Sequence, residues 1–219
     1  MDDGHLLIDK PAAMTSFGVV ARLKRVLSER AGKKIKVGHT GTLDPFATGM
    51  MIVVVGKECR NAQSYSKLDK VYEATIRLGA TSSTGDTEGE LTVVSNTQPS
   101  EQAVRSCLEQ FVGTITQTPP IYSAIKIGGQ RAYDRARRGE SIEMPSRHVD
   151  VYSLDLIEYS YPDIMIRVHV SSGTYIRSLA VDIGEQLGVG AYCIELRRTA
   201  VGKWSVEDAK TLGSFGITS

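Results

Sequence analysis

Cysteine is scarce in this chain of 219 residues, and its three cysteines follow neither a disulfide pattern nor a metal-binding pattern. Cys59, Cys107 and Cys193 are odd in number, lie far apart in the sequence and include no C-x-x-C pair. This spacing argues against a disulfide framework and a structural zinc site, and it is typical of a protein in a reducing cytosol. The four histidines form no H-E-x-x-H arrangement, so we expect no catalytic metal.

Targeting signals and long apolar runs are also missing from the sequence. Residues 1–5 contain neither the positive nor the apolar region of a signal peptide. No apolar run approaches the length that crosses a membrane. We therefore expect a soluble cytoplasmic protein without a membrane partner. A hydrophobic content of 41% and a charged content of 23% are ordinary globular values and argue against global disorder.

An excess of charge of either sign is absent too, because the formal net charge is only +1. The cations are nevertheless clustered. Residues 22–36 contain seven cations and only Glu29 as an acid. Residues 126–147 contain six cations, among them Lys126 and Arg131, against three acids. We interpret the two clusters as a path for a polyanion, with a solvated helix face and a polar loop as the alternative.

Segment 38–49 carries the most distinctive pattern of the chain. It reads GHTGTLDPFATG, with three glycines, three threonines, His39 and a single acid, Asp44. Pro45 favours an extended backbone at Asp44, and the apolar run 50–55 that follows is typical of a buried strand. A carboxylate on a stiff loop that leads into the core is well placed for chemistry, while an ordinary Asp-Pro turn is the alternative. A phosphate-binding transferase is disfavoured because no G-x-x-x-x-G-K-[ST] motif occurs.

The periodicity of the chain predicts an α+β fold around a mixed sheet, in one large domain. Strands are expected at residues 6–8, 50–55, 71–79, 149–157, 164–170 and 192–198. Helices are expected from a Thr15 or Ser16 cap to residue 31, from Ser100 to a break at 118–120, from 174 to 187, and after a Ser205 capping box. Segment 123–148 is polar and lacks apolar periodicity, so we expect an insertion that projects from the sheet.

Together these segments resemble the catalytic domain of the bacterial-type TruB family of tRNA pseudouridine synthases. The motifs that carry the resemblance run in order through nearly the whole chain: LIDKP at 7–11 with Thr15 and Ser16, VGHTGTLDP at 37–45, KVY at 70–72, LGATSSTGD at 78–86, PPIYSA at 119–124, SSGTYIRSL at 171–179 and LRRT at 196–199. The resemblance implies conversion of uridine 55 in the TΨC loop of tRNA to pseudouridine, without a cofactor. It also implies a mixed, mostly antiparallel sheet flanked by helices.

The resemblance assigns catalytic roles to three residues. Asp44 corresponds to the nucleophile of the family, and a buried carboxylate of this kind needs a nearby cation to stay ionised. Arg177 is the cation that the family motif offers, near the start of a helix whose dipole also favours an anion. Tyr72 corresponds to the tyrosine that stacks on the target base and helps to move a proton. Without the resemblance, Tyr72 is typical of a core tyrosine and Arg177 of a helix surface.

Five further residues are expected to bind the substrate. The resemblance places His39 against the RNA near the flipped base, Tyr175 as polar support of the pocket and Leu196 as its apolar wall. Lys126 and Arg131 lie in the basic insertion 123–148, which corresponds to a thumb that is mobile alone and closes on RNA. The Lys10-Pro11 pair is expected to support the active-site loop.

The same resemblance separates this chain from its guide-RNA-dependent relatives, which lack the thumb. We therefore expect a stand-alone enzyme that recognises the T stem-loop by shape and sequence. No apolar stripe is evident, so we expect a monomer. Many family members continue into a C-terminal RNA-binding module of the PUA type. We expect residues 1–219 to be the catalytic domain without it, a difference that weakens tRNA affinity more than chemistry.

Two alternatives remain open from the sequence. The first is a module that binds or folds tRNA without essential catalysis. The second is a metal site at Asp86, Glu88 and Glu90, although alternating acids in a glycine-bearing loop are more often solvated.

Overall fold

The computed structural model describes residues 3–123, 125–140 and 142–217, and the chain forms two compact units. Unit 1 consists of Met1–Glu73 and Glu195–Ser219, and unit 2 of Ala74–Ile194. Two long strands, β4 (Lys70–Leu78) and β12 (Ala191–Val201), contribute residues to both units.

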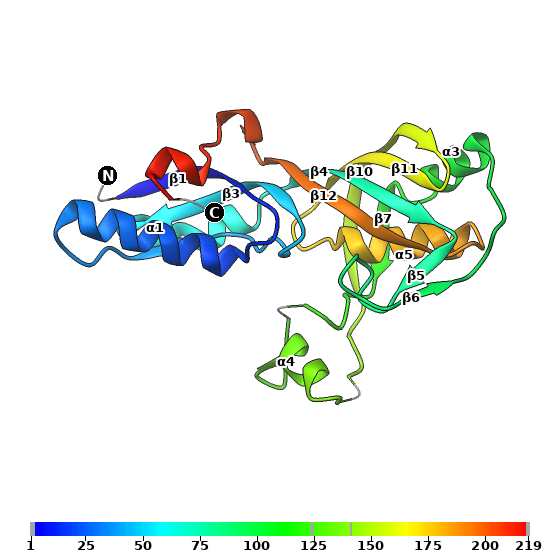
Figure 1. The fold of residues 1–219 in the computed structure, drawn as a ribbon, viewed down its shortest axis with the longest axis horizontal. Coiled ribbons are helices and arrows are strands. Elements are labelled where there is room, and N and C mark those ends of the chain that lie inside the picture. The colour runs from blue at the N-terminus through cyan, green and yellow to red at the C-terminus, as the bar shows by residue number, and fades with distance from the viewer. Residues whose placement is uncertain (1–2, 124, 141, 218–219) are drawn as a thin grey trace. The chain divides into compact units, whose positions relative to one another are not determined.

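Unit 1 is built around a small sheet covered by one long helix (Figure 1). Its other elements are β1 (Gly4–Lys10), α1 (Ser16–Ala31), β2 (Val37–His39), β3 (Thr48–Val55), the 3-10 helix η1 (Gly56–Asn61), α2 (Ala62–Ser66), β13 (Trp204–Ser205), and the 3-10 helices η2 (Val206–Asp208) and η3 (Leu212–Phe215). β3 is the central strand, because it pairs antiparallel with β1 and β2 and in parallel with β12.

Unit 2 is built around antiparallel strands that pack against helices. Its other elements are β5 (Ala80–Ser82), β6 (Leu91–Val93), α3 (Glu101–Glu109), β7 (Gly113–Gln117), β8 (Lys126–Ile127), β9 (Gln130–Arg131), α4 (Ala132–Arg137), β10 (Arg147–Ser160), β11 (Asp163–Val170) and α5 (Ile176–Gln186). β10 pairs antiparallel with β11 and β7, and α3 packs against β10 and α5.

Within the described residues, the main sheet has the strand order β1-β3-β12-β4-β11-β10-β7, with β2 on β3 and β13 on β12. The sheet is mixed and mostly antiparallel, which confirms the α+β prediction. β4 alternates buried and half-buried residues along its whole length, as predicted, and seven of the eight residues of β3 are buried. No helix in the described part of the chain is both long and apolar enough to cross a membrane.

α1 forms where the sequence predicts it. Val19, Leu23 and Leu27 lie one helical turn apart and are buried. The Thr15 hydroxyl caps the helix, accepting a hydrogen bond of 2.9 Å from the Gly18 N–H, and Gly32 ends it in the left-handed region. This cap leaves the neighbouring Ser16 hydroxyl available for another partner.

Three predicted element boundaries are wrong. The helix after Ser100 ends at Glu109, and strand β7 follows it, because residues 113–117 pair with the edge of β10. α5 begins at Ile176, with Tyr175 at its N-cap position. The expected terminal helix is only the three-residue η2, since the chain beyond it hydrogen-bonds to β1 through the backbone of Lys210.

The insertion 123–148 carries more local structure than its sequence pattern indicates. β8 and β9 pair as a short hairpin, α4 follows them, and the last two residues of the segment already belong to β10. Two of its apolar residues, Ala132 and Met144, are buried. In Figure 1 the segment extends from the rest of unit 2, as predicted.

The backbone at Gly49 generates a first prediction. Gly49 and Gly32 both have positive φ, at 104° and 64°, so an alanine at either position costs roughly 1–2 kcal/mol of backbone strain. An added Cβ would overlap the backbone of Arg198 at Gly49, whereas it would contact nothing at Gly32. In urea unfolding, we expect Gly49→Ala to lower the free energy of unfolding by at least about 3 kcal/mol and Gly32→Ala by about 1 kcal/mol. Equal losses would contradict this account of Gly49.

Candidate active site

The loop between β2 and β3 carries Asp44 and is closed by its own backbone. The Thr40 N–H and hydroxyl both donate to the Ile52 carbonyl, each at 3.2 Å. The Ala47 N–H donates to the Asp44 carbonyl at 3.2 Å, so Asp44 and Pro45 open a tight turn, as the sequence also indicated. Leu43 and Ala47 are buried on either side of the half-buried Asp44. The carboxylate is therefore held on a rigid turn with part of its surface open.

Ser16, in the first turn of α1, hydrogen-bonds to the backbone of Leu43, the residue before Asp44. Its hydroxyl donates to the Leu43 carbonyl at 2.9 Å and accepts from the Leu43 N–H at 2.8 Å. Both backbone groups of Leu43 are thus satisfied by one side chain in a buried place. The sequence left open whether Thr15 or Ser16 caps α1. In the structure Thr15 is the cap, and Ser16 binds Leu43.

Lys10, at the end of β1, is fully buried and binds the other side of the turn. Its ammonium group donates to the carbonyls of Pro11 at 2.8 Å, Met14 at 2.7 Å and Pro45 at 3.2 Å. Burial lowers the pKa of Lys10 to about 8, the negative charge of Asp44 opposes this shift, and Arg198 adds to it. Lys10 therefore supports the loop, as expected, and is also a cation electrostatically coupled to Asp44.

Arg198, on β12, is the residue that sequence reasoning missed. Its side chain is only 2% exposed. Its guanidinium donates to the carbonyls of Met50 at 2.6 Å, Gly41 at 3.2 Å and Thr42 at 3.4 Å, so one planar group fixes both ends of the loop. In the sequence, Arg198 is marked only by the LRRT block at 196–199, and from that block only Leu196 was predicted as a site residue.

His39 lies at the end of β2 and is half-buried. Burial lowers its pKa, and the charge of Arg198 lowers it further. Both effects favour the neutral form of the ring. Its Nδ1 is buried and has no hydrogen-bond partner among the described residues.

Tyr72 and Leu196 complete the predicted residues of unit 1. Tyr72 lies on β4 and Leu196 on β12, and each is 7% exposed. Next to Tyr72, the strand is anchored by Lys70, whose ammonium donates to the Ser66 carbonyl at 2.7 Å and to the Leu68 carbonyl. Unit 1 therefore contains four predicted site residues, namely His39, Asp44, Tyr72 and Leu196.

Arg177 belongs to unit 2, where it is the second residue of α5 and is almost fully buried. Its guanidinium donates to the Thr84 and Tyr122 carbonyls at 2.9 Å each and forms an ion pair with Asp86 at 3.1 Å. The alternative of an arginine on a helix surface is excluded by this burial.

Asp86 is buried, whereas the sequence favoured a solvated carboxylate at this position. It is 3% exposed, and besides Arg177 it accepts hydrogen bonds from the Thr84 hydroxyl at 2.5 Å and from the Glu88 N–H at 3.0 Å. Glu88 and Glu90 are exposed, as the solvated reading of this loop expects. Across the described ranges, no three His, Cys, Asp or Glu side chains are grouped so that they could hold a metal ion.

Tyr175 is fixed at the N-cap of α5 by a buried amide. Its N–H donates to the Gln117 side-chain oxygen at 2.7 Å, and its carbonyl accepts from the Gln117 side-chain nitrogen at 2.9 Å. The guanidinium of Arg147 lies 5.0 Å from the centre of its ring. Gln117 lay in the stretch that the sequence predicted as helix, so its role was not visible.

Lys126 and Arg131 have their backbones in β8 and β9, directly opposite each other in the hairpin. Their side chains lie outside the described residues, and their predicted contact with RNA stays a prediction.

Comparison with known proteins gives the class and the family. The profile of the N-terminal domain of TruB family pseudouridylate synthases matches residues 24–176, and that of the tRNA pseudouridylate synthase B C-terminal domain matches residues 177–215. The chain is 44% identical over 213 residues to tRNA pseudouridine synthase B of Burkholderia mallei (strain NCTC 10247), covering 97% of this chain and 69% of the relative. Identity to the protein of the same name from Thermobifida fusca (strain YX) is 46% over 224 residues, covering 97% and 74%.

A solved structure supports the same assignment. A chain of the crystal structure of a Cbf5-Nop10-Gar1 complex superimposes with a TM-score of 0.75 at 32% identity, over 97% of this chain. The present chain spans about half of that one, 53%. Fold and comparisons together define a pseudouridine synthase, an isomerase that acts on RNA uridine. Within this class, the chain belongs to the TruB family of pseudouridylate synthases.

The hydrogen bonds between Arg198 and the Asp44 loop generate a second prediction. Arg198→Lys keeps the positive charge but loses the planar fork that reaches three carbonyls. We expect it to lower the free energy of unfolding by about 2–4 kcal/mol and to slow isomerisation. The matched control is Arg197→Lys on the same strand, where the side chain is 39% exposed and pairs with Asp9. In urea unfolding the control should lose no more than about 1 kcal/mol. A loss at Arg197 as large as that at Arg198 would refute the assigned role.

Proposed function

We propose that this enzyme converts uridine 55 in the TΨC loop of tRNA to pseudouridine. The observation that carries the proposal is the Asp44 turn, held by Lys10, Ser16 and Arg198, in a chain with 44–46% identity to relatives named tRNA pseudouridine synthase B. A single carboxylate fixed in this way is suited to react at one position of a bound nucleotide.

The reaction that we propose breaks the N1–C1′ glycosidic bond, rotates the freed uracil and joins its C5 to C1′. The proton on C5 is released and N1 takes up a proton, so the change is an isomerisation without oxidation or reduction. The Asp44 carboxylate has three possible roles: attack on the sugar, attack on the base, or stabilisation of a glycal-like intermediate. Each role requires an ionised carboxylate, and coupling to the Lys10 ammonium favours that form.

We propose Tyr72 and Arg177 as the partners of Asp44 in catalysis. Tyr72 would stack on the target base and move a proton through its hydroxyl. Arg177 would provide a second counter-cation. Its hydrogen bonds to two carbonyls and its ion pair with Asp86 support this role, because they fix the orientation of the guanidinium before substrate arrives.

Substrate binding must compensate for base flipping, which costs a few kcal/mol of lost stacking. We propose that His39, Tyr175 and Leu196 contact the extruded nucleotide and its surroundings, and that segment 123–148, with Lys126 and Arg131, closes on the RNA. We further propose that the enzyme acts as a monomer and without a guide RNA. The presence of the 123–148 insertion supports action without a guide RNA.

The nucleophile assignment generates a third prediction. Asp44→Asn keeps the size of the side chain but removes the charge, so tritium release from tRNA carrying 5-tritiated uridine should fall by roughly 10³-fold or more. Binding of the tRNA should change little, because the backbone hydrogen bonds that hold Leu43, Pro45 and Ala47 do not depend on the charge of the Asp44 side chain. The matched control is Asp208→Asn, an exposed aspartate of η2, which should retain full activity.

Wild-type release should be one tritium per tRNA, and it should vanish when uridine 55 is replaced by cytidine. Binding and refolding of tRNA without any release by the wild type would favour the tRNA-folding module instead.

The electrostatics of His39 generate a fourth prediction. Because burial and Arg198 lower its pKa, His39 contacts RNA as a neutral ring. His39→Gln should therefore weaken RNA binding at pH 7.5 without changing the slope of log Kd against log salt concentration. A decrease of the slope would show that His39 is charged in the complex. The lowered pKa also predicts that stability falls as the pH drops below 6.5, since the unfolded histidine then binds the proton more readily.

A further inference from the structure

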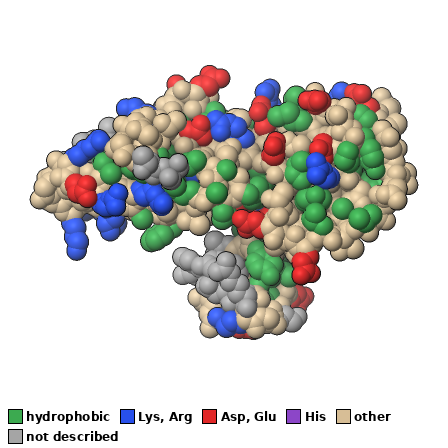
Figure 2. Space-filling model, in the orientation of Figure 1, with side chains coloured by type: hydrophobic (Ala, Val, Ile, Leu, Met, Phe, Trp, Pro, Cys, Tyr) green, Lys and Arg blue, Asp and Glu red, His purple; other side chains and the backbone are tan. Residues whose placement is uncertain are grey.

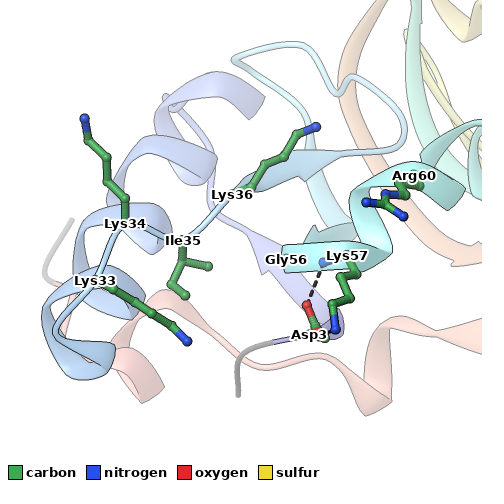
Figure 3. A pocket seen from close by; sticks show the side chains of 8 residues that line it. All are labelled: Asp3, Lys33, Lys34, Ile35, Lys36, Gly56, Lys57 and Arg60. Atoms are coloured by element: carbon green, nitrogen blue, oxygen red, sulfur yellow. Dashed lines mark hydrogen bonds and ion pairs between the residues drawn. The ribbon is translucent and has the colours of Figure 1, made fainter.

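Unit 1 contains a basic cavity (Figure 3). It measures about 510 Å³ and is lined by Asp3, Lys33, Lys34, Ile35, Lys36, Gly56, Lys57 and Arg60. Five cations and one carboxylate give this lining a formal charge of +4, on a chain whose net charge is +1. A local excess of this size favours a polyanionic ligand. Figure 2 also shows Lys and Arg side chains gathered along the α1 side of unit 1.

The backbone of residues 34–36, which carries two lysines of this basic cavity, is held in place by packing and hydrogen bonds. Ile35 is buried, packs with Leu27 and Val55, and donates its N–H to the Ser28 hydroxyl at 3.0 Å. The Lys36 carbonyl accepts from the Gly56 N–H at 2.7 Å, which ties the loop to the end of β3. Lys34 and Lys36 flank the buried Ile35 and are exposed, so the backbone from which their side chains project is fixed in advance of binding.

The single carboxylate of the cavity is already engaged. Asp3 accepts from the Lys57 N–H at 2.6 Å and forms an ion pair with the Lys57 ammonium at 3.6 Å (Figure 3). Lys34, Lys36 and Arg60 have no acidic partner among the described residues. Their charges are available to an external anion. No aromatic side chain lines the cavity, so it is suited to phosphates and not to stacked bases.

The cavity and the Asp44 turn lie at opposite ends of β3. The turn precedes Thr48, and the cavity begins at Gly56, beyond Val55. Eight residues at roughly 3.3 Å each separate the two places by about 25 Å. Even at the rise of B-DNA, about 3.4 Å per nucleotide, this span equals roughly seven base steps, and the shorter rise of an A-form RNA duplex requires more. This number of steps exceeds the stem of a T arm.

We propose that this cavity binds the phosphodiester backbone of the RNA substrate at a point outside the hairpin that holds the target uridine. The inference rests on the proposed tRNA function and adds a second anchoring place to it. Such contacts carry no sequence information, and they position the RNA while the Asp44 site selects the nucleotide.

The test compares two RNAs and two matched double variants. Lys34→Gln/Lys36→Gln removes two cations of the cavity, and Lys67→Gln/Lys203→Gln removes two exposed cations elsewhere in unit 1. Kd is measured by fluorescence anisotropy over a range of salt concentrations, for a whole tRNA transcript and for the isolated T-arm hairpin. For whole tRNA, the cavity variant should bind on the order of 10-fold more weakly near 0.1 M salt, with a slope smaller by roughly 1.5–2.

For the hairpin, the cavity variant should bind like the wild type and isomerise it at the same rate. The control variant should match the wild type on both RNAs. Unchanged binding of whole tRNA by the cavity variant, or an equal loss on the hairpin, would overturn the proposal. Failure of the wild type to isomerise either RNA would instead overturn the proposed function, so the two failures are distinguishable.

Discussion

The burial of one guanidinium, that of Arg198, is the constraint on which the site of unit 1 depends. Arginine cannot give up its charge, so a buried arginine must find acceptors for its N–H groups. The acceptors here are the carbonyls of Gly41, Thr42 and Met50, which stand at the two ends of the Asp44 loop. The parallel pairing of Arg198 with Gly49 brings the two backbones too close for any side chain at residue 49. The shape of the Asp44 loop, the glycine at position 49 and the pairing of β3 with β12 therefore depend on one another.

The same cation sets the electrostatics of its neighbours. Arg198 lowers the pKa of Lys10, His39 and Lys70, in each case in addition to burial. Asp44 is the acid that opposes the shift at Lys10. A neighbouring positive charge favours the ionised form of a carboxylate, which is the form that the proposed role of Asp44 requires. Main-chain carbonyls accept hydrogen bonds from Lys10, Lys70 and Arg198, and these bonds offset the cost of burying the three cations.

Unit 2 uses the same device a second time. Arg177 binds the carbonyls of Thr84 and Tyr122 and pairs with buried Asp86. In both units a buried arginine thus organises irregular backbone that strands and helices alone would not fix. Rigid loops of this kind are suited to the proposed reaction, in which a flipped nucleotide must be held still. Lys34 and Lys36, which are exposed in unit 1, are suited to the proposed phosphate contacts.

The sequence by itself determined the α+β class, the alternation along β4, the α1 cap region, the family and the importance of the Asp44 loop, because these depend on local pattern and on motifs. The supporting role of Lys10 was also predicted from the sequence, but only the tertiary structure showed that Ser16 and Arg198 hold the same loop. These two residues are separated from Asp44 by 28 and 154 positions in the sequence. Strand β7 and the short η2 were likewise decided by pairing with β10 and β1. The physical reason is that a buried charge or an edge strand is satisfied by whatever partner the folded chain brings near, and hydrophobic periodicity contains no record of that partner.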